Sequence, residues 1–291
     1  MSLTLKNVLK KMIRRLLEFF FGGGRPDFII VGAQKSGTSS LFNYLNKSPE
    51  MIGSTIKELH YFDREDNFKK GDVWYESHFL RMPGKKGLFF EASPSYLARE
   101  CVPQRIASYK SDIKIIVLLR EPISRAYSAW NMYRYLSEEG KIPASTRKDH
   151  IGRSESPVYS VFFKNGCPSF SDYIDYELDL IKQGDGDEEP SVLRRGIYKP
   201  QLERYARIFG RENMLVIGFN ELKVDSEAVV KKCHDFLGVP YTSLGSGQTR
   251  KIQNKKPYTS SINDRDIQIL EDFYARPNSE LKEWLGYDID W

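Results

Sequence analysis

The sequence contains few of the residues that cross-link small proteins or hold metals. Among 291 residues there are only three cysteines and four histidines. Cys101, Cys167 and Cys233 are odd in number and widely spaced, which argues against a disulfide scaffold and favours a reducing compartment. No cysteines or histidines have the spacing of a metal-binding motif, so we expect no metal site.

A long uncharged apolar run is also missing, which argues against a membrane-spanning helix. The 44 basic and 39 acidic residues leave a net charge of only +5. That surplus suits one anionic ligand in a cleft, but unless clustered it is too small for a nucleic-acid-binding surface. With 40% hydrophobic and 13% aromatic residues, the chain can bury a large core. We expect a cytoplasmic protein without a nucleic-acid partner.

Residues 1–21 form a separate segment in which basic residues interrupt apolar positions three and four apart. A signal peptide would place its charges before one apolar block. The spacing instead predicts a helix, with two interpretations. It docks on the globular body or on a second copy, which is the commoner use of an apolar stripe, or it lies peripherally on an anionic membrane. The glycines of 22–24 would form a flexible joint, so a single domain would occupy 25–291.

The remaining chain alternates short β-branched runs with amphipathic segments. We predict strands over 28–31, 88–91, 114–119 and 215–219, and helices over about 38–46, 170–182, 202–209 and 229–237. Two further helices are predicted around 267–274 and 281–285. This alternation predicts an α/β protein, a three-layer α/β/α arrangement with a central parallel sheet. We interpret 137–195 as an insertion over the active-site face.

A glycine-bearing loop, Gly32-Ala-Gln-Lys-Ser-Gly-Thr-Ser-Ser40, follows the first predicted strand and leads into a helix. Such a loop presents backbone N–H groups and the positive end of a helix dipole to an anion. It is similar to the nucleotide-binding P-loop, with one difference: Thr38 occupies the usual lysine position, and the lysine lies within the loop as Lys35.

A second anion site is predicted where the strand 114–119 ends. Arg120 follows the strand directly, and Ser124 and Ser128 lie in the helix that Pro122 begins. An NTPase commonly has a carboxylate there to hold magnesium, whereas arginine binds phosphate bidentately. Two cationic sites without an evident magnesium ligand indicate a nucleotide with phosphates at both ends of its ribose.

These motifs together resemble those of sulfotransferases that use 3′-phosphoadenosine-5′-phosphosulfate (PAPS). Residues 28–41 are similar to that family's 5′-phosphosulfate loop, and 115–128 to its 3′-phosphate motif. Between them, Lys57-Glu-Leu-His-Tyr-Phe62 is similar to the acidic segment of the heparan-sulfate branch. The likeness extends through 90–96 and 195–198 to 236–238, and it implies a P-loop-like sulfotransferase fold.

The resemblance implies which residues bind the donor, PAPS, and its product, adenosine 3′,5′-bisphosphate (PAP), without a metal. The implied nucleotide-binding residues are Lys35, Ser36, Gly37, Thr38, Ser39, Arg120, Ser128 and Tyr198. Lys255 and Lys256 belong to a late basic stretch that either closes over the nucleotide or forms a solvated turn.

Sulfuryl transfer is an in-line displacement that needs positioning, charge stabilisation and a base. The resemblance implies that Lys35 acts near the bridging oxygen and that Glu58 is the catalytic base. His60 shares the face of Glu58 if the segment is extended, as the rival base or as a group that orients Glu58. Alternatively, Glu58 is a surface carboxylate paired with Lys57. Glu91 and Tyr96 are expected to reach the same crevice.

The acceptor is predicted only broadly, as a hydroxyl or amine of a small molecule or saccharide. Members of the family that act on heparan sulfate often have a lysine where Ala92 stands and a disulfide-closed hairpin that this chain lacks. These departures favour a soluble bacterial enzyme whose acceptor cleft is walled by the variable insertion at about 137–195. Two other functions remain open: a magnesium-dependent P-loop kinase or NTPase, and a membrane-associated nucleotide-binding protein without catalysis.

Overall fold

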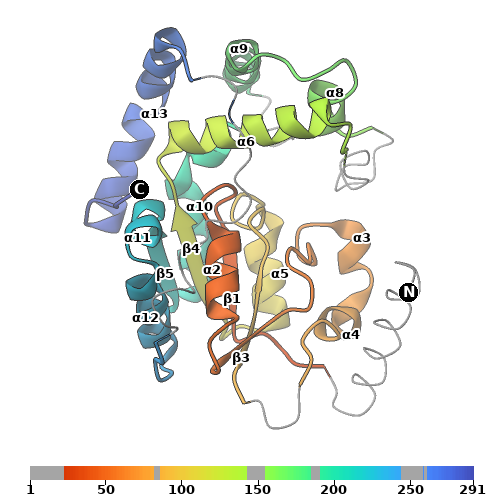
Figure 1. The fold of residues 1–291 in the computed structure, drawn as a ribbon, viewed down its shortest axis with the longest axis vertical. Coiled ribbons are helices and arrows are strands. Elements are labelled where there is room, and N and C mark those ends of the chain that lie inside the picture. Colours follow the sequence, from red (N-terminus) through yellow and green to blue (C-terminus); the bar gives the residue numbers. More distant parts are fainter. Residues whose placement is uncertain (1–22, 82–85, 143–154, 185–190, 244–257, 259–260) are drawn as a thin grey trace.

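Five parallel strands form a single sheet in the order β2-β3-β1-β4-β5 (Figure 1). The computed structural model describes residues 23–81, 86–142, 155–184, 191–243, 258 and 261–291. The strands are β1 (Phe28–Gly32), β2 (Met51–Gly53), β3 (Leu88–Ala92), β4 (Lys114–Leu119) and β5 (Met214–Gly218). The predicted α/β class, with its central parallel sheet, is confirmed. The predicted N-terminal helix lies outside the described residues.

Helices cover both faces of the sheet and one of its ends (Figure 1). The α-helices are α2 (Thr38–Leu45), α3 (Glu65–Phe68), α4 (Gly71–Glu76), α5 (Cys101–Tyr109), α6 (Pro122–Glu138), α8 (Pro157–Phe162), α9 (Phe170–Lys182), α10 (Tyr198–Phe209), α11 (Phe219–Val224), α12 (Ser226–Leu237) and α13 (Asp264–Leu285). Two short 3₁₀ turns, η1 (Arg194–Gly196) and η2 (Arg211–Asn213), precede α10 and β5. None of the helices in the described part of the chain has the length and apolarity needed to cross a membrane.

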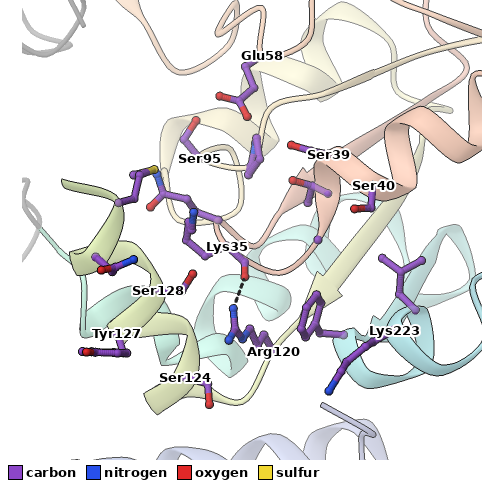
Figure 2. A pocket seen from close by; sticks show the side chains of 18 of the residues that line it. Lys35, Ser39, Ser40, Glu58, Ser95, Arg120, Ser124, Tyr127, Ser128 and Lys223 are labelled. Carbon is purple, nitrogen blue, oxygen red and sulfur yellow. Dashed lines mark hydrogen bonds between the residues drawn. The ribbon is translucent and has the colours of Figure 1, made fainter. Parts of the chain in front are cut away.

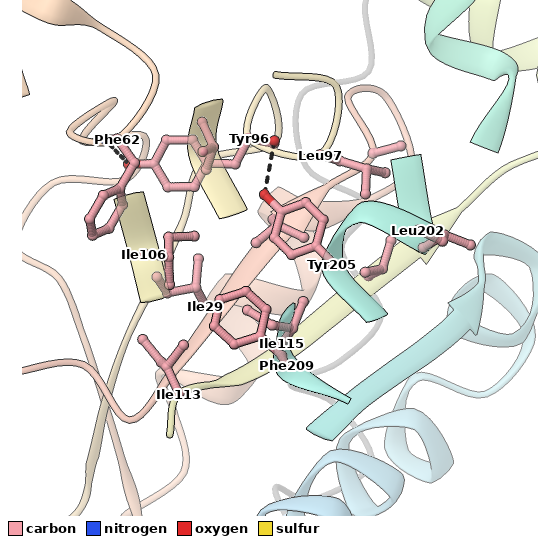
Figure 3. Close-up of a cluster of buried hydrophobic side chains, with 14 of the residues drawn as sticks. Ile29, Phe62, Tyr96, Leu97, Ile106, Ile113, Ile115, Leu202, Tyr205 and Phe209 are labelled. Carbon is pink, nitrogen blue, oxygen red and sulfur yellow. Dashed lines mark hydrogen bonds between the residues drawn. The ribbon is translucent and has the colours of Figure 1, made fainter. Parts of the chain in front are cut away.

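The core is divided by the sheet because successive side chains of a strand point to opposite faces. Ile29 of β1 packs on one face with α5 and α10, where Ile106, Leu202 and Tyr205 are fully buried (Figure 3). Phe28 points to the other face, toward the cluster formed with α2 and α12. Strand β1 is buried along its whole length, as expected for a central strand covered on both sides.

The pairing of β1 with β4 determines where the two predicted anion-binding motifs lie. Ile29 pairs with Ile115 in parallel register, so both strands end at the same edge of the sheet. The loop 33–37 follows β1 at that edge, and Arg120 follows β4. Helix α6 then lies across the end of the sheet (Figure 1). Two motifs more than 80 residues apart are thereby brought together at the carboxyl ends of the strands.

The C-terminal region differs from the sequence prediction, since a single helix α13 replaces the two expected ones and continues through Pro277. Leu270 and Tyr274 pack in the cluster around α6 and α9, while Leu281 and Leu285 pack in the cluster around α10. Proline inside a helix costs about 3 kcal/mol. Burial of these four side chains at about 2 kcal/mol each exceeds that cost, so the helix continues.

Strand β2 has only three residues, Met51–Gly53, and was not predicted. Its place at the sheet edge comes from its pairing with β3, where Met51 pairs with Leu88. A run this short carries no detectable period, so the strand is defined by tertiary pairing rather than by local pattern.

Candidate active site

The loop between β1 and α2 has the backbone shape required for close approach to an anion. Gly37 has a φ of 89°, and a Cβ built there would lie 3.0 Å from side-chain atoms of Phe219 and Leu222. Only glycine satisfies both conditions without strain. The carbonyl of Gly37 accepts the N–H of Ser40 at 2.9 Å, which begins the first turn of α2. Thr38 and Ser39, the first residues of α2, line the cavity beside the loop.

Arg120, at the end of β4, joins this loop to the next wall of the site. Its Nη1 donates to the backbone carbonyl of Lys35 at 3.3 Å, and its guanidinium lies over the Phe219 ring at 4.9 Å. The following residue, Glu121, caps α6 by accepting the N–H groups of Ile123 and Ser124, both at 2.7 Å. The cap fixes the start of α6, and with it the direction in which the serines of that helix point.

One cavity of about 780 Å³ contains most of the predicted site residues. Its lining includes Lys35, Gly37, Thr38, Ser39, Glu58, His60, Arg120 and Ser128. Figure 2 shows Lys35 between two groups: Arg120, Ser124 and Ser128 lie on one side of it, and Glu58 and Ser95 lie on the other. A cavity of this size is in the usual range for a cofactor or small-molecule site.

Glu58, His60 and Asp63 form a connected series of side chains at the Glu58 end of the cavity. His60 Nε2 lies 3.9 Å from Glu58 Oε2, and its Nδ1 lies 3.1 Å from Asp63 Oδ2. Ser95 Oγ donates to Asp63 Oδ2 at 2.5 Å and lies 3.2 Å from His60 Nδ1. With Nδ1 held by Asp63, the other ring nitrogen faces Glu58. The pair of Glu58 with Lys57 also exists, at 2.5 Å, while Glu58 still lines the cavity.

The charges around His60 act on its protonation. Burial alone would lower the pKa of His60, but the hydrogen bond and charge of Asp63, together with the charges of Glu58 and Glu91, raise it above the usual value. Burial would raise the pKa of Asp63, yet its bonds with His60 and Ser95 and the charge of Arg99 lower it below the usual value. Asp63 is thus held as a carboxylate beside a histidine that keeps its proton to higher pH.

Glu58 and His60 are positioned by an unusual backbone. The sequence prediction placed them on one face of an extended segment, but Glu58 has a φ of 63° and His60 a φ of 50°. The extended conformation was therefore wrong, although both side chains do face the same cavity. Lys35, with a φ of 71°, is the only other non-glycine residue with positive φ in the described part of the chain. Such backbone costs free energy and persists where surrounding contacts enforce it.

A buried layer beneath the cavity holds this segment in place. The N–H of His60 donates to Ser93 Oγ at 3.3 Å, and the N–H of Tyr61 donates to the Tyr96 hydroxyl at 2.8 Å. Both hydroxyls in turn donate to the carboxylate of Glu91, at 2.8 Å from Ser93 and 3.1 Å from Tyr96. Glu91 thereby anchors the backbone that carries the site, two layers below it.

Glu91 itself is fully buried, which corrects the expectation that Glu91 and Tyr96 reach the crevice. Neither side chain lines the cavity. Tyr75 donates a third hydroxyl to Glu91, at 2.6 Å. Burial raises the pKa of Glu91 to about 7, although these three hydroxyls act in the opposite direction. Glu91 pairs with Ile29 and shares its face of the sheet, where Tyr75 and Tyr96 cover it.

Two of the predicted nucleotide-binding residues lie behind the cavity wall. The side chain of Ser36 is fully buried, so only its backbone N–H is placed to contact a ligand in the loop. Tyr198 is 1% exposed, and its hydroxyl donates to the carbonyl of Arg120 at 2.7 Å. The cavity lining includes neither of them. Lys255 and Lys256 lie outside the described residues.

The described part of the insertion that was expected to wall the cleft packs against α6. Its described helices, α8 and α9, pack against α6, as Phe162 on Tyr133 and Phe170 on Tyr127 illustrate. Among the described residues of 137–195, none lines the cavity. Helix α9 buries an apolar face that includes Tyr173 and Ile174, and the surface available to it is the side of α6 turned away from the sheet. The predicted helix at 170–182 is correct, with Ser169 as its cap.

Sequence reasoning missed several residues that shape the site. Asp63 follows His60 at a spacing of three, a weak signal, and Ser95 follows β3 at the same sheet edge. Gln34 lines the cavity and accepts a hydrogen bond from Arg195 at 3.0 Å. Phe219 and Lys223, from α11, complete the wall beside Arg120. Their places depend on contacts across the fold, which no local motif announces.

Fold and site together define a class: an α/β protein with a glycine-bearing loop after β1 and, after β4, an arginine where an NTPase commonly has a magnesium-binding carboxylate. A family model described as the sulfotransferase domain matches residues 25–260. The chain therefore belongs to the sulfotransferase family. The predicted resemblance is confirmed at this level.

Curated relatives share the family at moderate identity. Heparan sulfate glucosamine 3-O-sulfotransferase 3B1 from Homo sapiens is 28% identical to this chain. The alignment covers 94% of this chain and 67% of that protein. Membrane-associated sulfotransferase kil1 from Dictyostelium discoideum is 21% identical, covering 91% of this chain and 66% of its own length. The chain thus spans about two thirds of the length of these relatives.

Solved structures support the fold. A sulfotransferase from Alicyclobacillus acidocaldarius is 27% identical, with a TM-score of 0.66 over 91% of this chain and 98% of that chain. The mouse sulfotransferase SULT7A1, at 17% identity, has a TM-score of 0.51 over 93% of this chain and 90% of its own. The second likeness bears on the fold alone. Both agree with the predicted P-loop-like three-layer architecture.

Proposed function

We propose that this chain transfers a sulfuryl group from PAPS to an acceptor hydroxyl or amine, without a metal. One observation carries the proposal: the loop with Lys35 and the strand-end residue Arg120 open into one cavity that also contains Glu58. An arginine and a loop of N–H groups suit phosphates at two ends of a nucleotide. A magnesium-dependent kinase, the sequence-level alternative, would need a carboxylate where Arg120 stands, and family membership also argues against it.

In this proposal the nucleotide lies along the line from Arg120 to the loop. Arg120 and Ser128 bind its 3′-phosphate, and the N–H groups of residues 36–39 bind its 5′-phosphate. The ammonium of Lys35 stabilises the negative charge that develops on the bridging oxygen as the sulfur–oxygen bond breaks. Tyr198 acts indirectly, because its bond to the carbonyl of Arg120 fixes the end of β4.

The base in this proposal is Glu58. The acceptor oxygen or nitrogen forms its bond to sulfur, its proton passes to the Glu58 carboxylate, and the bridging electron pair leaves with PAP. His60, held by Asp63, orients Glu58 from 3.9 Å. A general base contributes about 10²- to 10⁴-fold to the rate. If Glu58 serves only as a partner of Lys57, His60 is the remaining base.

We further propose a class of acceptor and a location for the protein. Relatives named for heparan sulfate support a saccharide hydroxyl, and a small-molecule hydroxyl remains the other choice. We propose a cytoplasmic enzyme. Its residues 1–21 either dock on the globular body or on a second copy of the chain, or they bind peripherally to a membrane. The name of one relative, a membrane-associated sulfotransferase, supports the membrane contact.

Calorimetry with PAP in the presence of EDTA, and with ATP in the presence of magnesium, tests the donor assignment. We expect PAP to bind without metal, and Arg120→Ala to weaken PAP about 10- to 100-fold, the usual effect of losing a charge-assisted bond. The matched control is Arg207→Ala, which removes an exposed guanidinium from α10. Tight binding of magnesium-ATP with no binding of PAP would refute the proposal.

A further inference from the structure

Arg195 reaches from the turn before α10 to the loop that follows β1. Its Nη1 donates to Oε1 of Gln34 at 3.0 Å, and its Nε donates to Oγ of Ser191 at 3.3 Å. Gln34 lines the cavity beside Lys35, whereas Arg195 is only 9% exposed and is not part of the lining. The contact therefore joins a side chain behind the cavity wall to one that faces the cavity.

The chemistry of this contact determines how the Gln34 carboxamide is turned. A guanidinium has hydrogen-bond donors and no acceptor, so the carboxamide must present its oxygen to Arg195. The Nε2 group, which carries two N–H donors, is the other branch of the same planar amide. Because Gln34 lies in the cavity wall, this orientation leaves those two donors available to a ligand in the cavity.

The turn that carries Arg195 is held from behind by a buried carboxyl group of α9. Glu177 is fully buried and accepts the backbone N–H groups of Leu193 at 2.7 Å and Arg194 at 3.0 Å. From α13, the hydroxyl of Tyr274 donates to the carbonyl of Leu193 at 2.7 Å. Two helices thus fix the backbone of η1, so the Arg195 side chain extends toward Gln34 from a rigid base.

We propose that Arg195 is a positioning residue that holds the Gln34 carboxamide with its N–H donors toward the sulfonate of bound PAPS, the group that is transferred. This rests on the proposed function, which places the ammonium of Lys35 at the bridging oxygen that carries this sulfonate. Gln34 directly precedes Lys35 in the loop, and an N–H donor suits an anionic oxygen. Gln34 binds the sulfonate, and Arg195 acts through Gln34 without touching the ligand.

A comparison of PAPS with PAP tests the contact, because the two nucleotides differ by the sulfonate. Calorimetry without an acceptor measures both Kd values. Gln34→Met keeps the length of the side chain but removes the amide, so we expect the Kd of PAPS to rise about tenfold and that of PAP to stay within about twofold. The matched control is Gln268→Met, which changes an exposed glutamine of α13 and should leave both Kd values as in wild type.

A double-mutant cycle tests whether Arg195 acts through Gln34. Arg195→Met removes the guanidinium, and we expect it to raise the Kd of PAPS at least about threefold. In the Gln34→Met background the same change should add less than about twofold, because the carboxamide that Arg195 positions is gone. Arg195→Lys should retain more PAPS affinity than Arg195→Met, since an ammonium also donates to the Gln34 oxygen and accepts nothing.

Three results would overturn the inference while PAP still binds to the wild type. These are an unchanged Kd of PAPS in Gln34→Met, an equal loss of PAP and PAPS affinity in that variant, and independent, multiplying effects in the cycle. The last result is the one expected if Arg195 is merely structural. Failure of the wild type to bind PAP would instead refute the proposed function. Circular dichroism spectra establish that the variants fold; if Arg195→Met does not, Arg195→Lys replaces it in the cycle.

Discussion

At the scale of single residues, the described non-glycine positions with positive φ are Lys35, Glu58 and His60. These are also the three residues that sequence analysis assigned to catalysis. Each such conformation costs on the order of 1 kcal/mol or more and must be enforced by its surroundings. For Glu58 and His60, the enforcing contacts are the N–H of Glu58 bound to the carbonyl of Ala92 at 3.1 Å and the N–H of His60 bound to Ser93.

Glu58→Gln keeps the size of the side chain but removes its basicity, so sulfuryl transfer should fall at least about 100-fold, the usual contribution of a general base. PAP affinity should change little, because Glu58 lies across Lys35 from Arg120 (Figure 2). Single-turnover assays with labelled donor, paired with calorimetry, measure the two effects.

Glu283→Gln, an exposed carboxamide substitution on α13, is the matched control and should retain wild-type turnover. Wild-type turnover in Glu58→Gln would transfer the role of base to His60. In that case His60→Asn should abolish transfer, and Asp63→Asn should weaken it by disturbing the ring nitrogen that Asp63 holds.

At the scale of elements, β3 supports the segment that carries Glu58 and His60. Its residue Glu91 accepts hydrogen bonds from the hydroxyls of Ser93 and Tyr96. These hydroxyls in turn accept hydrogen bonds from the backbone N–H groups of residues 60–62. Burying an ionised carboxylate among hydroxyls is unfavourable in free energy. This burial raises the pKa of Glu91 to about 7, above the usual value of 4.5.

That raised pKa predicts how stability depends on pH. Between pH 4.5 and about 7 the folded protein keeps the Glu91 proton that the unfolded chain releases, so the free energy of unfolding falls as pH rises through this range. The difference corresponds to about 3 kcal/mol. We expect urea unfolding of wild type to lose stability from pH 5 to pH 8, and Glu91→Gln to lose about 3 kcal/mol less.

Tyr75→Phe provides the control for this measurement. It removes one hydroxyl from Glu91 but leaves the two that reach residues 60–62, so the pH-dependent loss of stability should persist. The same pH slope in Glu91→Gln and wild type would show that Glu91 does not titrate in this range. Turnover provides a second readout, because Glu91→Gln should lower kcat more than Tyr75→Phe does.

At the scale of the whole molecule, the role of residues 1–22, which lie outside the described part of the chain, is left to experiment. Gly23 and Gly24, expected as a flexible joint, are instead held by a bridge to Leu80 and a hydrogen bond to the carbonyl of Phe79. If the apolar stripe of residues 1–21 docks on the body or on a second copy, deletion exposes the surface that it covers. The chain 23–291, which keeps the contacts of Gly23 and Gly24 with the body, should then melt several degrees lower, because about 2 kcal/mol shifts Tm by roughly 4–8 °C for a domain of this size. Differential scanning calorimetry of the two chains measures this.

Flotation with vesicles distinguishes the membrane interpretation. Under docking, neither chain should float with vesicles that contain phosphatidylserine, and analytical ultracentrifugation reports whether the full chain dimerises. Flotation of the full chain with anionic vesicles but not with neutral ones, and an unchanged melting temperature after deletion, would contradict docking in favour of a peripheral amphipathic helix.

Continuous stretches of sequence were enough to predict the α/β class, the loop with Lys35 and the strand end at Arg120. Each is encoded by neighbouring residues: a buried β-branched run followed at once by glycine, lysine or arginine. The same locality explains why β2 and the unbroken helix α13 were missed. Their existence depends on pairing with β3 and on burial against α6 and α10, which are tertiary contacts.

The geometry of the site could be read only from the tertiary structure. Ser95 and Gln34 join the predicted residues because the parallel order of β3, β1 and β4 brings three strand ends to one edge, and Asp63 joins them through its bond to His60. The sheet also turned Glu91 inward and placed Tyr198 behind Arg120, where their sequence motifs had suggested direct contact with ligand. Residue types near a strand end follow from local pattern, but the direction in which each side chain points depends on what packs against it.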